Sequence, residues 1–246
     1  MTEADDRPAQ GLVRVMTWNI HGAVGRNPRF DLARVVSLVR RHRPDIVALQ
    51  EVDSRRARAA DVGNPFEVLQ HALGGHGIGA KTVTTADGEY GQALISRWPL
   101  HDTQIHDLSF GNREPRRAIC TDVLTPSGPL RVIATHLGLS LRERRSQSTA
   151  LLKMLGTLRT TTVALGDFND WFWAGSVRRC LQRALPGYSR QSTFPARWPL
   201  FHLDRLYTWP REALVRSHTD PEARALSDHL PVIGDIAMLR HGPTDG

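Results

Sequence analysis

Residues 163–170 read Val-Ala-Leu-Gly-Asp-Phe-Asn-Asp, and this stretch carries the clearest structural pattern in the chain. The three apolar residues 163–165 predict a buried strand. Gly166 lets the backbone turn, and Asp167 and Asn169 then stand two residues apart. On an extended segment, side chains at that spacing point to the same side. The stretch therefore predicts a strand that presents a carboxylate and a carboxamide together at its end.

The pair Asp167 and Asn169 has two interpretations. A carboxylate and a carboxamide are costly to desolvate, and together they can accept a proton from water and donate a hydrogen bond to a phosphate oxygen. Glycine, aspartate and asparagine are also ordinary turn residues. Taken alone, the pair supports a catalytic site and an Asx-rich turn equally.

Composition limits the class of protein. A chain of 246 residues fits one large domain or two small ones, and 40% hydrophobic content suits an ordered globule. The net charge of +7 favours an anionic partner, although nearly all the basic residues are arginine, a skew that genome composition can also produce. The only cysteines, Cys120 and Cys180, form neither a zinc motif nor a disulfide framework.

The ends of the chain predict its organisation. Residues 1–11 form a polar tail unlike a signal peptide, and no apolar run approaches the roughly 18 residues of a membrane span. We expect a single catalytic domain at 12–240, a C-terminal tail at 241–246, a monomer and a cytoplasmic location.

Hydrophobic periodicity predicts alternating strands and helices. Asp31 should cap a helix that ends near Pro44. Residues 54–65 should form a loop, and no regular element is predicted between residue 170 and residue 203. A short helix is expected at Phe66–Leu73, and a second amphipathic helix around Leu151, Leu152, Leu155 and Leu158. Further strands are expected at 12–17, 46–49, 78–84, 92–96, 118–124, 130–135, 203–208, 213–217 and 231–237. This order favours two packed sheets flanked by helices.

Chemically capable residues stand at or beside the ends of several predicted strands. They are Asn19, Glu51, His136, Asp167 with Asn169, Asp204, and Asp228 with His229. Each alone is most simply a turn, a cap or a satisfied core residue. Their recurrence predicts that the strand ends meet at one edge, where loops hold a site on a rigid scaffold.

These residues lie in blocks that resemble the endonuclease/exonuclease/phosphatase superfamily, the deoxyribonuclease-I-like fold. Seven blocks occur in the family's order and span about residues 12 to 237. They are Thr17-Trp-Asn-Ile-His-Gly22, Leu49-Gln-Glu-Val-Asp53, Gly91-Gln-Ala-Leu-Ile-Ser-Arg97, Ala134-Thr-His-Leu137, Gly166-Asp-Phe-Asn169, His202-Leu-Asp-Arg-Leu-Tyr207 and Ser227-Asp-His-Leu-Pro231.

The resemblance implies a four-layered α/β/β/α sandwich of two mostly antiparallel sheets, and metal-assisted hydrolysis of a phosphate ester. It implies that Glu51 is the main metal ligand and that Asn19 and Asp228 support the metal or its waters. An oxygen set of this kind suits Mg²⁺ or Mn²⁺.

The resemblance also implies roles in the chemistry. Asp167 would orient or deprotonate the attacking water, and Asn169 would hold a phosphate oxygen. His229, oriented by Asp204, would contact the scissile phosphate, and a carboxylate beside it should raise its pKa. His136 would be a second phosphate or leaving-group contact. Some relatives pair this histidine with a carboxylate, for which Glu89 is a candidate here, although a solvated loop acid is the simpler interpretation.

The identity of the phosphate ester stays open between nucleic acid, inositol phosphate and phospholipid. Arg116, Arg117 and Arg145 are candidate substrate contacts, together with Trp171 and the aromatic residues after it. Arginines form three clusters, 55–58, 113–117 and 142–145, of which the last two contain these candidates, and each cluster is equally well a solvated loop. Trp171, Phe172 and Trp173 could instead pack under their own loop.

A hypothesis of a different class is a non-catalytic basic module that binds nucleic acid or anionic lipid. The intact set of acids and histidines argues against it, because binding alone does not require that set.

Overall fold

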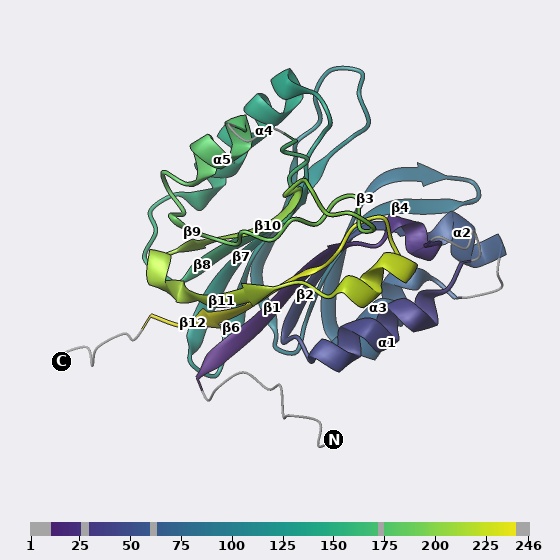
Figure 1. The fold of residues 1–246 in the computed structure, drawn as a ribbon, viewed down its shortest axis with the longest axis horizontal. Coiled ribbons are helices and arrows are strands. Elements are labelled where there is room, and N and C mark those ends of the chain that lie inside the picture. Colours follow the sequence, from purple (N-terminus) through teal and green to yellow (C-terminus); the bar gives the residue numbers. More distant parts are fainter. Residues whose placement is uncertain (1–10, 26–29, 60–62, 172–174, 240–246) are drawn as a thin grey trace.

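The structure is a computed structural model that describes residues 11–25, 30–59, 63–171 and 175–239. Most of its regular elements are strands, and helices are interspersed among them (Figure 1). None of the helices among the described residues is both long enough and apolar enough to cross a membrane.

The first sheet has six strands in the order β11-β12-β1-β2-β4-β3. Strands β1 and β2 run parallel, and the other neighbours are antiparallel. The strands are β1 (Leu12–Asn19), β2 (Ile46–Asp53), β3 (His76–Thr85), β4 (Gly88–Ser96), β11 (Leu214–His218) and β12 (Val232–Ala237).

The second sheet also has six strands, in the order β5-β6-β7-β8-β10-β9, with one parallel pair formed by β7 and β8. Its strands are β5 (Leu100–Asp107), β6 (Arg117–Thr125), β7 (Gly128–His136), β8 (Thr162–Asp167), β9 (Gly187–Tyr188) and β10 (Asp204–Trp209).

Three apolar clusters hold four layers together. One lies between the two sheets and includes Val15 and Leu165. The others join each sheet to its outer helices: α1 (Leu32–His42) and α3 (Pro65–Leu73) cover the first sheet, and α4 (Leu141–Leu155) and α5 (Ser176–Leu181) cover the second. The predicted α/β/β/α sandwich is therefore confirmed.

Local signals explain several boundaries. Asp31 accepts a hydrogen bond from the backbone nitrogen of Arg34 and begins α1, as predicted, and Arg43 ends that helix in a left-handed conformation. Helix α4 begins with a capping box in which Ser140 and Glu143 exchange hydrogen bonds. It starts ten residues before Leu151, where the periodicity indicated a helix.

Other predictions were wrong. Residues 54–65 are not all loop, because α2 (Ser54–Ala59) follows β2 directly. Strand β5 was missed, since most of its side chains are exposed and it lacks an alternating apolar pattern. The stretch after residue 170 contains α5 and the two-residue strand β9.

Gly166 does not form a turn. It lies inside β8, and the chain turns only after Asp167. Its φ is +153°, and a Cβ there would come within 1.9 Å of the Thr135 carbonyl oxygen of β7. The glycine is therefore needed so that the parallel pair β7 and β8 can approach closely beside the site.

Candidate active site

The predicted polar residues gather at one edge of the sandwich because of strand direction. In each sheet the parallel pair, β1 with β2 and β7 with β8, ends at this edge. Strands β12 and β10 run antiparallel to their neighbours β1 and β8, so they begin there. The starts of two strands and the ends of four others thus meet, as the sequence predicted.

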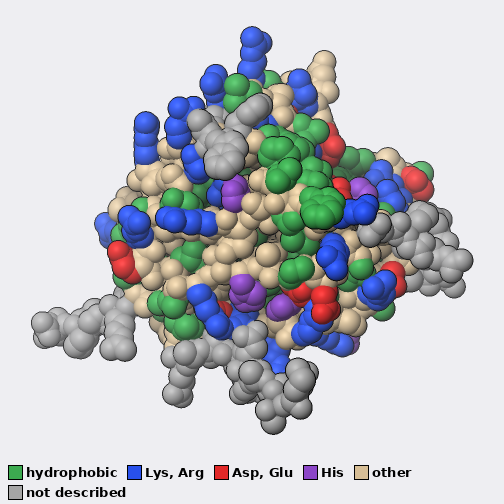
Figure 2. All heavy atoms as spheres, in the orientation of Figure 1, with side chains coloured by type: hydrophobic (Ala, Val, Ile, Leu, Met, Phe, Trp, Pro, Cys, Tyr) green, Lys and Arg blue, Asp and Glu red, His purple; other side chains and the backbone are tan. Residues whose placement is uncertain are grey.

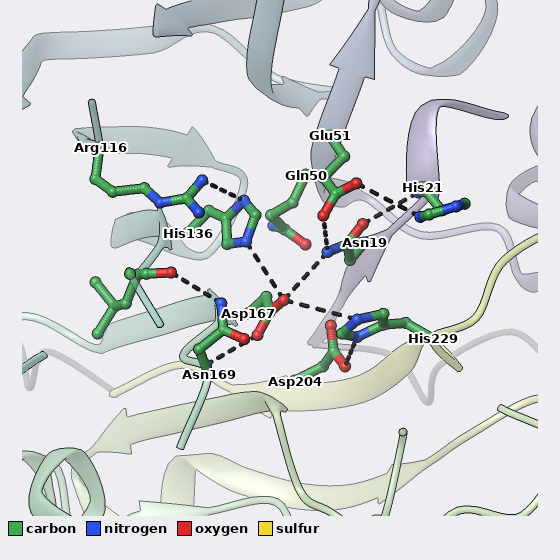
Figure 3. Close-up of polar contacts among 12 residues, drawn as sticks. Asn19, His21, Gln50, Glu51, Arg116, His136, Asp167, Asn169, Asp204 and His229 are labelled. Atoms are coloured by element: carbon green, nitrogen blue, oxygen red, sulfur yellow. Dashed lines mark hydrogen bonds and ion pairs between the residues drawn. The ribbon is translucent and has the colours of Figure 1, made fainter. Parts of the chain in front are cut away.

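Asp167 lies at the centre of this edge (Figure 3). It is the register partner of His136 in β7 and of Asp204 in β10, so the three residues stand side by side across three strands. Its Oδ2 accepts a hydrogen bond from Asn19 Nδ2 at 3.1 Å. The Nε2 atoms of His136 and His229 lie 3.5 and 3.9 Å from the same oxygen.

Burial decides the proton affinity of Asp167, which is only 1% exposed. Desolvation raises the pKa of Asp167 to about 6, although His229 opposes this shift and the hydrogen bonds from Asn169 and Asn19 oppose it as well. A carboxylate whose pKa lies near neutrality is suited to accept a proton from water.

His229 and Asp204 form a buried ion pair. His229 Nδ1 lies 2.8 Å from Asp204 Oδ2, and both side chains are nearly inaccessible. Burial alone would lower the pKa of His229, but Asp204 and then Asp167 outweigh burial and raise it to about 10. The imidazole is therefore a cation at neutral pH, with Nε2 directed toward Asp167 (Figure 3).

His136 is in the opposite state. Burial, followed by the charges of Arg116 and His229, holds the pKa of His136 well below its usual range. Arg116 Nη1 lies 3.3 Å from His136 Nδ1. Because a guanidinium only donates, Nδ1 must carry the lone pair, and the ring proton is assigned to Nε2, which faces Asp167.

The candidate partner Glu89 does not contact His136. Glu89 pairs with Lys81 at 2.7 Å. The position beside the ring is taken by Arg116, which is 6% exposed and also bonds Glu114. The predicted substrate contact Arg116 is therefore a neighbour of His136 instead of an open surface arginine.

Asn19 links Asp167 to Glu51. Its Nδ2 donates to Glu51 Oε1 at 2.8 Å as well as to Asp167, and its Oδ1 accepts from the backbone nitrogen of His21. The side chain of His21, which the sequence did not single out, lies 3.7 Å from Glu51 and 3.5 Å from Asp228. Its place in the block around Asn19 was the only signal for it.

Glu51 does not end its strand. The pairing of β2 with β4 is interrupted between Leu49 and Val52, and Glu51 has a φ of +57°. A bulge of this type turns a side chain away from its alternating position. It brings Glu51 toward Asn19, and the strand then continues to Asp53.

Two sets of residues are candidates for a divalent metal. Single ligand atoms of Asp167, Asp204 and His229 lie within 4.8 Å of one another. His229 makes this set a poor one for Mg²⁺, because an imidazole nitrogen suits softer metals.

The second set is Glu51, Asp228 and the oxygen of Asn19. The side chains of Glu51 and Asp228 are 25% and 46% exposed, so an ion here could keep several waters, as Mg²⁺ prefers. All the donor atoms are hard oxygens. The residues therefore fit Mg²⁺ or Mn²⁺ better at Glu51 than at His229.

Asn169 does not continue an extended strand beside Asp167. Its φ is +49°, and its backbone nitrogen donates to Asp167 Oδ1, so the two residues close an Asx turn. Its Nδ2 donates to the Leu137 carbonyl at 2.8 Å. The Asx turn is thus part of the site, and within the described residues the second N–H of Asn169 Nδ2 has no acceptor, so it can donate to a ligand.

The other predicted substrate contacts lie in different settings. Arg117 is half-buried at the start of β6, and Arg145 is exposed on α4. Trp171 packs edge-on against Phe194 and Phe201, with ring centroids 5.2 and 5.3 Å away. Phe172 and Trp173 lie outside the described residues.

Comparisons with known proteins identify a family and a fold for this chain. The sequence model of the Endonuclease/Exonuclease/phosphatase family matches residues 16–229. The uncharacterized protein YbhP of Escherichia coli (strain K12) is 29% identical, over 95% of this chain and 99% of YbhP.

Solved structures share the fold. The endonuclease/exonuclease/phosphatase from Beutenbergia cavernae DSM 12333 is 23% identical with a TM-score of 0.69, over 93% of this chain and 72% of that one. The human Nocturnin catalytic domain with bound sulfate anion is 18% identical with a TM-score of 0.68, over 93% and 95% of the two chains.

Proposed function

The chain belongs to the endonuclease/exonuclease/phosphatase family, whose members hydrolyse phosphoester bonds and generally use divalent metals, and on that premise we propose that it is a metal-dependent phosphodiesterase. One observation carries the proposal: Asp167 is buried at the edge where four strands end and two begin, with the Nε2 atoms of His136 and His229 at 3.5 and 3.9 Å from its Oδ2. A structural aspartate at that depth would be expected to pair with an arginine or lysine, and among the described residues Asp167 has no such partner.

We assign the proton transfer to Asp167. Its carboxylate accepts a proton from the water that attacks phosphorus, and Asn19 holds Oδ2 in place through a hydrogen bond of 3.1 Å. The Asx turn with Asn169 fixes the other oxygen, Oδ1. Both oxygens are therefore oriented before substrate arrives.

The remaining residues stabilise the phosphate. The His229 imidazolium, held by Asp204, supplies a positive charge and a hydrogen bond to a phosphate oxygen. The free N–H of Asn169 and the Nε2–H of His136 supply neutral donors on the other side of Asp167. A Mg²⁺ or Mn²⁺ ion held by Glu51 and Asp228, with Asn19 orienting Glu51, would add the cation that offsets charge building on the phosphate.

The test is hydrolysis of an aryl phosphodiester by the purified protein in Mg²⁺ or Mn²⁺, with and without chelator. Three proteins are compared: wild type, Asp167→Asn, and the control Asp102→Asn, which makes the same change at an exposed position on β5. We expect metal-dependent turnover that only Asp167→Asn abolishes. Turnover that survives both chelator and Asp167→Asn would contradict the proposal.

A substrate panel separates the classes that the family blocks leave open. Supercoiled plasmid, abasic duplex, single-stranded RNA, inositol phosphates and phospholipid vesicles would be assayed under the same conditions. Binding to any of them with no metal-dependent turnover on the whole panel would favour the non-catalytic module.

A further inference from the structure

A cavity of about 410 Å³ opens beside the candidate active site, between the turn after β8, helix α5 and strands β9 and β10. Asp170 and Trp171, which directly follow the Asx turn, form part of its wall. A volume of this order suits a ligand the size of a nucleotide. None of the proposed catalytic or metal residues lines it, so it is a separate subsite.

The cavity is strongly basic. Arg178, Arg190 and Arg205 line it together with a single acid, Asp170. Lys and Arg side chains also gather on the upper and left parts of the molecule in Figure 2, where α4, α5 and β9 lie in Figure 1. An anionic group is therefore the expected occupant.

Arg205 is a buried arginine whose guanidinium is held by backbone carbonyl groups. It is only 5% exposed, its Nε donates to the His202 carbonyl at 2.9 Å, and its Nη1 donates to the Ser189 carbonyl at 3.3 Å. Two nitrogens are thus fixed by the backbone, and Nη2 has no protein acceptor among the described residues. A buried, oriented donor of this kind is suited to a phosphate oxygen.

Arg178 supplies a second uncommitted cation. Its backbone nitrogen donates to Asp170 Oδ2 at 3.1 Å, but within the described part of the chain its guanidinium forms no hydrogen bond or ion pair. Asp170 Oδ1 is buried without a hydrogen-bond partner and remains an acceptor for a base N–H or a sugar hydroxyl.

The wall also contains the aromatic rings of Tyr188, Trp171 and Phe201, beside Leu200 and His202. Tyr188 lies under Arg190, whose guanidinium carbon is 5.4 Å from the ring centroid. Trp171 and Phe201 are in edge-to-face contact on the other side. Aromatic faces next to arginines bind a planar base together with its phosphate, whereas an inositol phosphate or a lipid headgroup offers no ring to stack.

Ring contacts connect the cavity to His229. The Phe194 ring lies 4.8 Å from the His229 imidazole and 5.2 Å from Trp171. A stacked strand advances about 3.4 Å per nucleotide, so a cavity two ring contacts away lies within about three nucleotides of a phosphate held at His229.

We propose that this cavity binds the base and phosphate of a nucleotide near the scissile bond, which makes single-stranded nucleic acid the substrate class. The inference rests on the proposed phosphodiesterase function. A single strand is favoured over a duplex because only an unpaired base can leave its stack and enter a cavity.

The first test measures binding without catalysis. A fluorescein-labelled single-stranded oligonucleotide is titrated in chelator and followed by anisotropy with wild type, Arg178→Gln, and the control Arg179→Gln, which alters the next arginine on α5, an exposed residue outside the cavity wall. We expect Arg178→Gln to weaken binding about tenfold and to reduce the slope of log Kd against log salt by about 0.7, the value for one lost phosphate contact on a single strand. The control should change neither. Equal effects of the two variants, or no effect of Arg178→Gln, would overturn the proposal.

The second test uses turnover and separates this inference from the proposed function. Tyr188→Leu and Arg178→Gln should raise KM about tenfold for a tetranucleotide, with little change for a small aryl phosphodiester that cannot reach the cavity. If the aryl ester is not hydrolysed by any form, the proposed function fails, and anisotropy still decides the cavity. The nucleotide assignment is wrong if the aryl ester is hydrolysed and both substitutions raise KM equally for the aryl ester and for the tetranucleotide. It is also wrong if the two substitutions raise KM only for inositol phosphates or phospholipid vesicles.

Discussion

Asp167 in β8 and Asp235 in β12 are equally buried aspartates with different hydrogen-bond donors. Each is 1% exposed. Asp235 accepts hydrogen bonds from Arg14 Nε at 2.8 Å and from Arg216. Asp167 receives only amide N–H groups, with two histidines at 3.5 and 3.9 Å.

The hydrogen-bond donors around each aspartate determine its pKa. Burial would raise the pKa of Asp235, but the hydrogen bonds from Arg14 and Arg216 lower it, so this carboxylate is held ionised. Burial raises the pKa of Asp167 to about 6 because no comparable cation bonds it. A fully paired carboxylate stabilises the sheet, and an under-paired one is available to react.

The largest expected effect is on catalysis at Asp167. Asp167→Asn keeps the shape and one of the two acceptor oxygens, which serve Asn19 Nδ2 and the Asn169 backbone nitrogen, but removes the base. We therefore expect kcat for an aryl phosphodiester to fall by about 10²–10⁴. The melting temperature at pH 8 should change little, because removal of a buried charge that the fold disfavours offsets the loss of one hydrogen-bond acceptor. A lower melting temperature with turnover preserved would reverse the roles assigned to the two aspartates.

The next effect is on stability at Asp235. Asp235→Asn removes the carboxylate charge that the buried Arg14 Nε and Arg216 bond, and we expect unfolding to become easier by about 3–5 kcal/mol. Urea titration would measure the loss, and kcat per folded molecule should stay within twofold of wild type. The matched control is Asp107→Asn on β5, an exposed acid whose loss should change stability little.

The sequence could predict much of the fold because its signals are local. Asp31 marks a helix start by its own capping bond, and buried runs such as 163–165 mark strands. Strand β5 gave no such signal because most of its side chains face solvent. A strand stabilised only by its neighbour β6 has no pattern of its own to detect.

The site was partly predictable for a related reason. Asn19, Asp167 and His229 stand in short blocks, so their types and order can be found in the chain. Strands β6 and β7 form a hairpin, but the side-chain contact between Arg116 and His136 at its open end is one that no spacing in the sequence reveals. The protonation state of each histidine therefore depends on contacts that form only when the chain folds.

The third prediction concerns the charge on His229. Its pKa is raised from 6.5 to about 10, so the ion pair stabilises the fold fully below about pH 6.5 and loses this contribution as pH rises toward 10. Asp204→Asn removes the largest contribution that raises this pKa. Unfolding of the metal-free variant should therefore depend less on pH between 6.5 and 10 than that of wild type.

NMR titration of the His229 ring in the same metal-free proteins provides a direct check. The ring should titrate at lower pH in Asp204→Asn, and the basic limb of activity, measured separately with Mg²⁺ added, should move down with it. An unchanged His229 titration would show that Asp204 does not set its charge.

The smallest expected effect separates the two histidines beside Asp167. Asp204 keeps His229 charged, whereas Arg116 helps to keep His136 neutral, and both rings are buried. Arg116→Met should raise the pKa of His136 and release its Nδ1, with a loss of kcat at pH 7 smaller than about tenfold, or about 1.4 kcal/mol of barrier. Arg113→Met, at an exposed position three residues earlier, is the control. If the His136 titration stays in place in Arg116→Met, then burial and the charge of His229 hold that ring neutral, and Arg116 belongs with the structural cations such as Arg14.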